Sequence, residues 1–199
     1  MFFLNNFFLF NIYLINFATN ANLIFSPQIY QIFKGAFAKV YHVVSSSNSH
    51  FALKKYIKTK KISLLSANNE IQYLSTLKHP NIIEMIDFEK KKNKFTSKTN
   101  SIIIIFDYCE GNLINFVKSH LDKSMIFPEA HIKNVLLDIT DAVGYLHHLD
   151  PPLVHRDIKL DNVLIKGNSY ILCDFGSCTV SPIELAKSNW EEINYDITK

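Results

Sequence analysis

The sequence predicts an α+β protein with two lobes, a strand-rich lobe at residues 26–106 and a mainly helical lobe at residues 112–199. Short apolar runs dominate the first lobe and are interrupted by one stretch of helical periodicity. A long amphipathic helix dominates the second lobe. A predicted hairpin after that helix carries two polar loops, which places candidate functional groups against one cleft.

Composition excludes several classes of function. The chain has 199 residues and 48% hydrophobic content, enough for one or two domains with a packed core. Its net charge is +3, but Arg156 is the only arginine. Nucleic-acid recognition relies on arginine, so no nucleic-acid partner is expected. The three cysteines, Cys109, Cys173 and Cys178, form no CxxC pair, which argues against a disulfide framework or a zinc site and favours reduced thiols in the cytoplasm.

Residues 1–25 form an apolar, asparagine-rich leader, which we exclude from the fold prediction. A membrane span takes about 20 apolar residues, so the length alone would allow one. The amides argue against a span because each would need a partner in lipid; they belong to Asn5, Asn6, Asn11, Asn16, Asn20 and Asn22. A secretory signal would need a positively charged start, which is missing. We expect an apolar leader or translated upstream sequence, with membrane anchoring as the alternative.

Residues 32–41 have the pattern of two strands joined by a turn at Gly35. Glycine lets the backbone approach a ligand closely and point its N–H groups at phosphate oxygens. Further on, Phe51-Ala52-Leu53-Lys54 is a short apolar strand out of which Lys54 alternates. Such a lysine is usually a surface residue that extends its ammonium group into water. By themselves these two stretches predict only strands.

A helix is predicted from Ser63 onward, because Leu64, Ala67, Ile71, Leu74 and Leu77 recur at helical spacing. Glu70 lies beside this stripe and is a candidate partner for Lys54. The helix is expected to end at His79-Pro80, since proline disfavours helical geometry in the residue before it.

The remaining elements are a loop, a strand and a helix. Lys90 to Lys94 and the polar residues that follow predict a solvated loop, and Ile102 to Ile105 predict a buried strand. The helix of the second lobe begins with Pro128 in its first turn and ends at His147 and His148. Its apolar face consists of Ile132, Val135, Leu136, Ile139, Ala142, Val143 and Leu146.

Two polar loops flank a predicted hairpin of Val163–Ile165 and Tyr170–Cys173. The first loop is His155-Arg156-Asp157-Ile158-Lys159-Leu160-Asp161-Asn162, and the second is Asp174-Phe175-Gly176. Either motif alone is weak, since glycine after an aromatic residue is ordinary in turns. Both are complete here, and apolar runs flank both.

With these two motifs, the chain resembles a eukaryotic-type serine/threonine protein kinase. The resemblance implies a two-lobed kinase fold, ATP and Mg²⁺ as cofactors, and protein substrates. It implies that Asp157 accepts the proton of the acceptor hydroxyl and that Lys159 steadies the transferring phosphate. It also implies that Asn162 and Asp174 hold the metal.

The resemblance places an ATP site between the lobes. Residues 32–41 would be the glycine-rich loop, although Phe33 and Ala38 stand where its first and third glycines are usual. Lys54 would contact phosphates and pair with Glu70, and residues 107–111 would form the hinge, with Phe106 before it as gatekeeper. The implied ATP-site residues are Ile32, Gly35, Ala36, Phe37, Ala38, Val40, Ala52, Lys54, Glu70, Phe106, Asp107, Cys109 and Leu164.

Several details are similar to the Numb-associated kinase family, which includes the adaptor-associated, cyclin-G-associated and actin-regulating kinases. The cues are Ala38, the segment Phe106-Asp107-Tyr108-Cys109 and the run from Leu172 to Thr179. Members are serine/threonine kinases associated with clathrin-mediated endocytosis and cortical actin. The resemblance therefore implies endocytic or cortical-actin substrates and a cytoplasmic location at the cell cortex or endocytic sites.

Residues 26–199 would be a kinase domain with an incomplete C-terminal lobe, since no A-P-E motif precedes Lys199. The apolar face of helix 128–147 would then be exposed. Two functions stay open. One is an ATP- and Mg²⁺-dependent kinase. The other is a catalytically inactive or decayed kinase-like binding module, for which Phe33 and the incomplete lobe argue.

Overall fold

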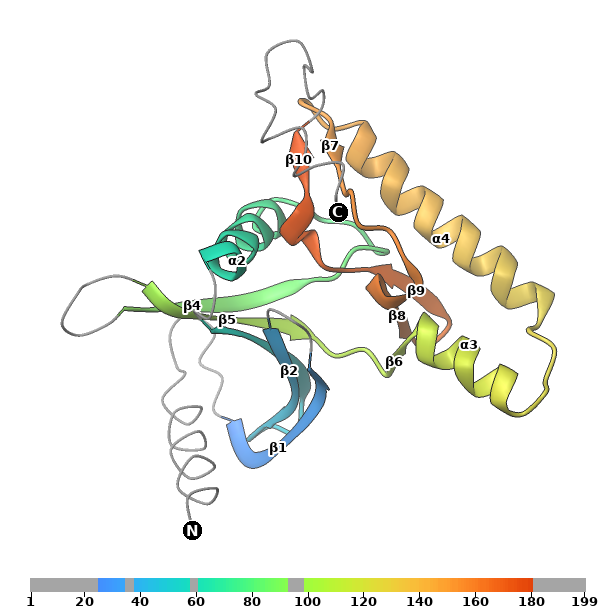
Figure 1. Ribbon diagram of the computed structural model, residues 1–199, viewed down its shortest axis with the longest axis horizontal. Helices are drawn as coiled ribbons and strands as arrows, with labels where there is room; N and C mark the ends of the chain where they lie inside the picture. Colours follow the sequence, from blue (N-terminus) through green and yellow to red (C-terminus); the bar gives the residue numbers. More distant parts are fainter. Residues whose placement is uncertain (1–24, 35–37, 58–60, 93–98, 181–199) are drawn as a thin grey trace.

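The computed structural model describes residues 25–34, 38–57, 61–92 and 99–180, which form a strand-rich lobe and a helical lobe (Figure 1). The α+β architecture with two lobes that the sequence predicts is confirmed. The first lobe is an antiparallel sheet in the order β1-β2-β3-β5-β4 with helix α2 packed against it. Its elements are β1 (Phe25–Lys34), β2 (Ala38–Ser45), β3 (His50–Ile57), α2 (Lys61–Leu74), β4 (Met85–Lys92) and β5 (Thr99–Asp107). The predicted leader lies outside the described residues, except for Phe25 at the start of β1.

Strand β5 contains four consecutive buried isoleucines, Ile102 to Ile105, whose side chains alternate between the two faces of the sheet. Ile102 and Ile104 join the main core beside α2, whereas Ile103 and Ile105 join a second cluster with Val43 and Leu53. Successive side chains of a strand point to opposite faces, so a continuous apolar run is buried twice. This confirms the buried strand predicted at Ile102 to Ile105.

Helix α2 is shorter at its end than predicted. It begins at Lys61 and ends at Leu74, so the prediction that it reaches His79-Pro80 is wrong. The Ser75 hydroxyl donates to the Ile71 carbonyl at 2.6 Å and the Thr76 hydroxyl donates to the Tyr73 carbonyl at 3.0 Å. The N–H groups of Thr76 and Leu77 both donate to the Tyr73 carbonyl, at 3.1 and 3.2 Å, so the last turn tightens and the helix ends there. Leu77 is nevertheless buried in the main core, as its place in the apolar stripe suggested.

The predicted loop at Lys90 to Lys94 is wrong in its first part. Lys90 and Lys91 belong to β4 and pair with Ile102 and Ser101 of β5. Backbone pairing to the buried central strand outweighs the weak strand preference of lysine. Lys94 lies outside the described residues.

The described part of the second lobe, residues 112–180, combines two helices with short strands and two 3₁₀ turns. Helix α3 was not predicted; Asn112 caps it by accepting the N–H of Asn115 at 3.1 Å. Pro128 is the residue before α4 rather than its first helical residue, and α4 ends at His147 as predicted. The elements are β6 (Gly111–Asn112), α3 (Leu113–Asp122), α4 (Glu129–His147), β7 (Leu153–Val154), η1 (Leu160–Asn162), β8 (Val163–Lys166), β9 (Ser169–Leu172), η2 (Phe175–Ser177) and β10 (Thr179–Val180).

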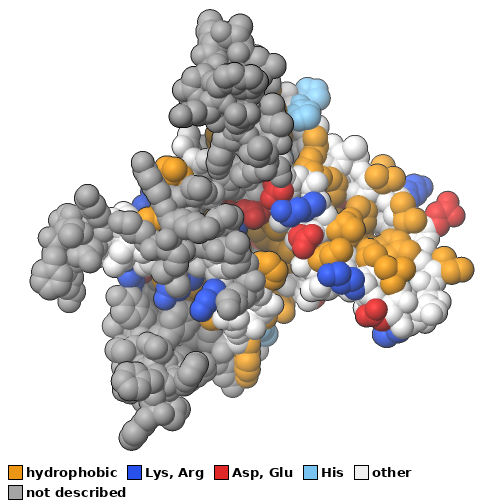
Figure 2. Space-filling view, in the orientation of Figure 1, with side chains coloured by type: hydrophobic (Ala, Val, Ile, Leu, Met, Phe, Trp, Pro, Cys, Tyr) orange, Lys and Arg blue, Asp and Glu red, His pale blue; other side chains and the backbone are white. Residues whose placement is uncertain are grey.

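Much of the apolar face of α4 is exposed. Ala142 and Leu146 are buried, but Ile132 and Leu136 are 47% and 62% exposed. Figure 2 shows hydrophobic side chains gathered over the side of the molecule formed by α3 and α4. None of the helices in the described ranges has the length and apolar composition of a membrane span.

The close packing of α2 against η2 depends on Gly176. A Cβ atom at this position would lie 3.0 Å from the Ser66 Cβ and 3.2 Å from the Ser66 carbonyl oxygen. Gly144, inside α4, has no such neighbour within 4 Å. The two glycines therefore differ in whether they leave room for a methyl group.

We expect Gly176→Ala to lower the free energy of unfolding by about 1–3 kcal/mol, the usual range for overpacking. Gly144→Ala serves as the control and is expected to raise it by about 0.5–1 kcal/mol, since alanine is favoured over glycine inside helices. Chemical denaturation of both variants measures the difference. A Gly176→Ala variant as stable as the wild type would contradict this packing.

Candidate active site

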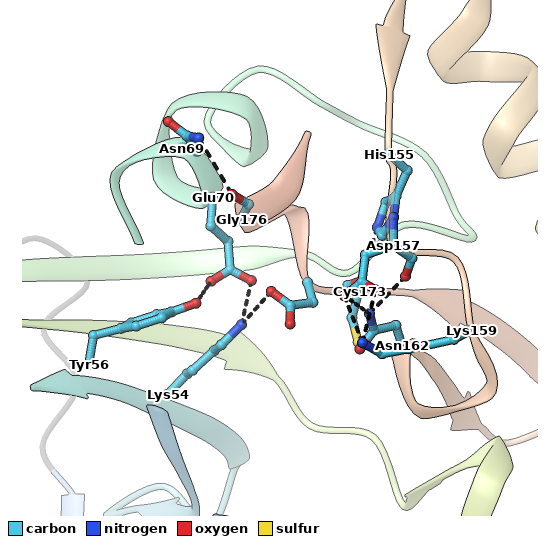
Figure 3. A network of polar contacts seen from close by, with 11 residues as sticks. Lys54, Tyr56, Asn69, Glu70, His155, Asp157, Lys159, Asn162, Cys173 and Gly176 are labelled. Atoms are coloured by element: carbon cyan, nitrogen blue, oxygen red, sulfur yellow. Dashed lines mark hydrogen bonds and ion pairs between the residues drawn. The ribbon is translucent and has the colours of Figure 1, made fainter. Parts of the chain in front are cut away.

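A buried ion pair joins the sheet to α2. The Lys54 Nζ lies 2.9 Å from Glu70 Oε1 and 3.1 Å from Asp174 Oδ1 (Figure 3). The Tyr56 hydroxyl donates to Glu70 Oε2 at 2.6 Å. Lys54 and Tyr56 are two apart in β3, so both side chains point to the same face, the one that α2 covers. The structure thus brings Lys54 and Glu70 together, as predicted.

These partners determine the charges at the centre of the site. Burial lowers the pKa of Lys54, but Glu70, Tyr56 and Asp174 outweigh burial and raise it well above its ordinary value. Lys54 therefore stays an ammonium. Burial raises the pKa of Glu70, against the effect of the nearby Lys54. The Lys54 ammonium holds the pKa of Asp174 below its usual range, so Asp174 is an ionised carboxylate.

The first polar loop gathers around the carboxylate of Asp157. The Lys159 ammonium donates to both carboxylate oxygens, at 2.9 and 2.8 Å. The amide of buried Asn162 donates to Asp157 Oδ2 at 2.9 Å and to the Asp157 carbonyl at 2.8 Å. Arg156 has a positive φ of 66°, a conformation that non-glycine residues seldom adopt. This turn brings the three polar side chains of the loop together.

Backbone hydrogen bonds hold the two polar loops side by side. The N–H of Cys173, directly before Asp174, donates to the carbonyl of Asn162 at 3.0 Å. His155 Nδ1 accepts the N–H of Asp157 at 3.3 Å, so its Nε2 carries the proton and donates to the Cys173 carbonyl at 3.1 Å. Burial lowers the pKa of His155, which is consistent with this neutral form. The side chain of Phe175 packs edge-on against His155, with ring centroids 4.9 Å apart.

The register of the sheet places several predicted ATP contacts on one face. In the sheet, Val40 lies opposite Lys54, and Ala52 lies opposite Phe106. Side chains of directly paired residues point to the same face of a sheet. Ala38 pairs with Tyr56 and shares that face. Across the chain, Ala52 and Leu164 of β8 pack against the same core cluster. Together these groups form an apolar surface next to Lys54.

The other predicted contacts are less closely grouped. Ile32 is 51% exposed on β1, and Phe33, in the place of the usual first glycine, is 52% exposed. Asp107 ends β5 and Cys109 follows in the link to the second lobe. Gly35, Ala36 and Phe37 lie outside the described residues.

Asn162 and Asp174 supply oxygen atoms of the kind that Mg²⁺ prefers. In the part of the chain that the structure describes, no group of three or more histidine, cysteine or acidic side chains could hold a metal. Mg²⁺ is usually bound by one or two carboxylates together with substrate phosphates, so a two-residue site next to a nucleotide is sufficient. The ionised carboxylate of Asp174 fits this chemistry.

Two residues of this network were not predicted from the sequence. Tyr56 supplies the hydrogen bond to Glu70, and the strand alternation from Lys54 would have found it. His155 joins the two loops through its ring nitrogens. The only sequence signal for this role was its position at the start of the first motif. Among the described residues, Cys109, Cys173 and Cys178 form no disulfide.

Comparisons with known proteins identify the class. Residues 28–192 match the protein kinase domain family, so the chain belongs to this family. It is 36% identical over 151 residues to the serine/threonine-protein kinase ppk30 of Schizosaccharomyces pombe, covering 72% of this chain and 15% of that protein. It is 35% identical over 170 residues to actin-regulating kinase 1 of Saccharomyces cerevisiae, covering 81% of this chain and 26% of that protein. The matched region therefore spans 15% and 26% of the length of these two relatives. Members of the family use ATP and Mg²⁺.

The buried, neutral His155 predicts a pH dependence of stability. A histidine has a pKa of about 6.5 in the unfolded chain, and burial makes the pKa of His155 lower in the folded protein. As the pH falls, the unfolded state therefore binds a proton more readily than the folded state does. The free energy of unfolding is therefore expected to decrease from pH 7 to pH 5, by up to about 1.4 kcal/mol per pH unit.

Denaturation at several pH values measures this slope, and His155→Gln is expected to reduce it. A residual slope is expected from His42, whose pKa is also lowered by burial and by His50. An identical slope in the variant and the wild type would refute the assignment.

Proposed function

We propose that this protein transfers the γ-phosphate of ATP to serine and threonine hydroxyls of proteins. The observation that carries the proposal is a chain of contacts. Lys54 forms an ion pair with Asp174. The Asn162 side chain donates a hydrogen bond to Asp157, and its backbone carbonyl accepts one from Cys173, the residue before Asp174. One connected network thus contains the candidate phosphate, metal and acceptor groups. Phosphoryl transfer depends mainly on such positioning and on charge stabilisation.

Each residue has a distinct task in this mechanism. The Asp157 carboxylate accepts the proton of the attacking hydroxyl. Asn162 orients that carboxylate by donating one hydrogen bond to Oδ2, and it donates a second to the Asp157 backbone carbonyl. Lys159, 50% exposed beside that carboxylate, can turn toward the transferring phosphate. Lys54 holds the phosphates of the nucleotide, and Glu70 keeps the ammonium in place. Bound ATP and Mg²⁺ supply the phosphoryl group and the positive charge that neutralises it; Asn162 and Asp174 would hold the metal.

The lysine at position 159 supports the serine/threonine class. The names of the relatives support the same class, since ppk30 is described as a serine/threonine-protein kinase. We extend the proposal to substrates of endocytosis or the cortical actin cytoskeleton, as in the Numb-associated kinases. Its support is the likeness to actin-regulating kinase 1 and the hinge segment from Phe106 to Cys109. A cytoplasmic protein at the cell cortex follows from the same proposal.

We expect Asp157→Asn to reduce turnover by a factor of about 100 or more, because it removes the general base. Nucleotide affinity should stay close to that of the wild type, since Asn has the size and shape of Asp and position 157 is not among the predicted ATP-site residues. The amide keeps only one of the two acceptor oxygens that Lys159 and Asn162 use. Transfer of labelled phosphate to serine, threonine and tyrosine peptides measures the rate and the class, and a fluorescent nucleotide measures binding.

Equal rates for the wild type and Asp157→Asn would refute the assigned base. A wild-type protein that binds nucleotide but transfers no phosphate would instead favour a kinase-like binding module, the alternative suggested by exposed Phe33 in place of a glycine.

A further inference from the structure

The link between the lobes is tied to the turn that joins β8 and β9. The Lys166 ammonium forms an ion pair with the carboxylate of Asp107, the last residue of β5. The N–H of Gly167 donates to the Glu110 carboxylate at 3.1 Å, and the N–H of Glu110 donates to the Ile165 carbonyl at 3.0 Å. Three polar contacts thus connect residues 107–110 to residues 165–167.

The sequence brings this turn to the link through local rules. Gly167 has a positive φ of 57°, which glycine adopts without strain in tight hairpin turns. Strand β8 also pairs with β6, with Gly111 opposite Ile165. The turn therefore starts beside the end of the link, and Lys166 is the next residue along.

Packing gives little support on this side of the link. A cavity of about 240 Å³ adjoins it, and its lining includes Asp107, Cys109, Lys166, Ile83 and Ile171. Apart from Asp107 and Cys109, none of the predicted ATP contacts lines it. Close-packed side chains usually hold a backbone segment in place, and here a pocket replaces part of that packing. The backbone of Asp107 is held from the sheet, where it pairs with Phe51 and its N–H donates to the Glu84 carbonyl at 3.1 Å. The polar contacts to the turn add support from the second lobe.

We propose that Lys166 is a positioning residue for nucleotide binding, because its ion pair with Asp107 fixes the backbone that contacts the adenine. The inference rests on the proposed function. In the kinase resemblance residues 107–111 are the hinge, and the backbone groups of residues 107–109 would hydrogen-bond the adenine edge of ATP. Lys166 itself lies outside the predicted ATP-site residues and acts only through Asp107.

The exposed fractions of the two side chains determine how much nucleotide affinity the ion pair can contribute. The side chains of Lys166 and Asp107 are 49% and 32% exposed, so solvent and salt weaken their attraction. Pairs of this kind change an equilibrium by a factor of about two to five. A change of this size should also shrink as salt is added.

The experiment compares the nucleotide affinities of the wild type, Lys166→Gln, Lys166→Arg and the control Lys133→Gln. Lys133 is an exposed lysine of α4, an element that contributes no residue to the link or to the predicted ATP site. Titration with a fluorescent ATP analogue at low and high salt gives the dissociation constants. We expect Lys166→Gln to bind about two to five times more weakly at low salt. Lys166→Arg and Lys133→Gln should bind like the wild type.

A double-variant comparison separates positioning from general destabilisation. If Lys166 acts through Asp107, Lys166→Gln combined with Asp107→Asn should bind no more weakly than Asp107→Asn alone. Equal affinity of Lys166→Gln and the wild type, or additive losses in the double variant, would overturn the inference. Absence of nucleotide binding by the wild type would overturn the proposed function and this inference with it.

Discussion

The ion pair between Lys54 and Glu70 is the interaction on which the arrangement of the described chain depends. Glu70 is only 1% exposed and the Lys54 side chain 14%, so both charges are largely removed from water. Such desolvation costs several kcal/mol per ion unless further hydrogen bonds compensate for it. Tyr56 and Asp174 provide that compensation. Since the four groups come from β3, from α2 and from the segment before η2, the charges are satisfied only when all three elements are in place.

This requirement links the sheet to the segments of the second lobe that carry the candidate catalytic residues. Asp174 accepts a hydrogen bond from the Lys54 ammonium. The backbone of its neighbour Cys173 is hydrogen-bonded to the Asn162 carbonyl and to the His155 ring. The close contact between Ser66 and Gly176 brings α2 to the same segment, and Phe175 is fully buried beside it. A displacement of α2 would therefore leave buried charge unpaired and would also disturb the segment that carries Asp174. Order in the first lobe and geometry in the polar loops are thus coupled.

The hinge region shows the opposite balance of forces. Glu70 and Tyr56 are buried beside Lys54, whereas both members of the Lys166–Asp107 pair are partly exposed and the pair adjoins a cavity. A weak, screened contact of this kind tunes the position of a backbone without determining the fold. The two pairs illustrate how burial decides whether an ion pair specifies structure or adjusts function.

The sequence alone indicated the class of fold, the partnership of Lys54 with Glu70, the two polar loops and the hairpin between them. The loops and the hairpin depend on motifs and short-range periodicity, and the partnership of Lys54 with Glu70 follows from the resemblance to kinases. The sequence analysis missed α3, which has a local cap at Asn112, and Tyr56, which lies on the same strand face as Lys54, although local patterns could have indicated both. It also did not predict the strand at Lys90 to Lys92, which depends on pairing with β5, or the tie between Lys166 and Asp107, which are 59 residues apart. Only the tertiary structure decides them, because the energy of such contacts is set by burial and distance, and neither exists until the chain has folded.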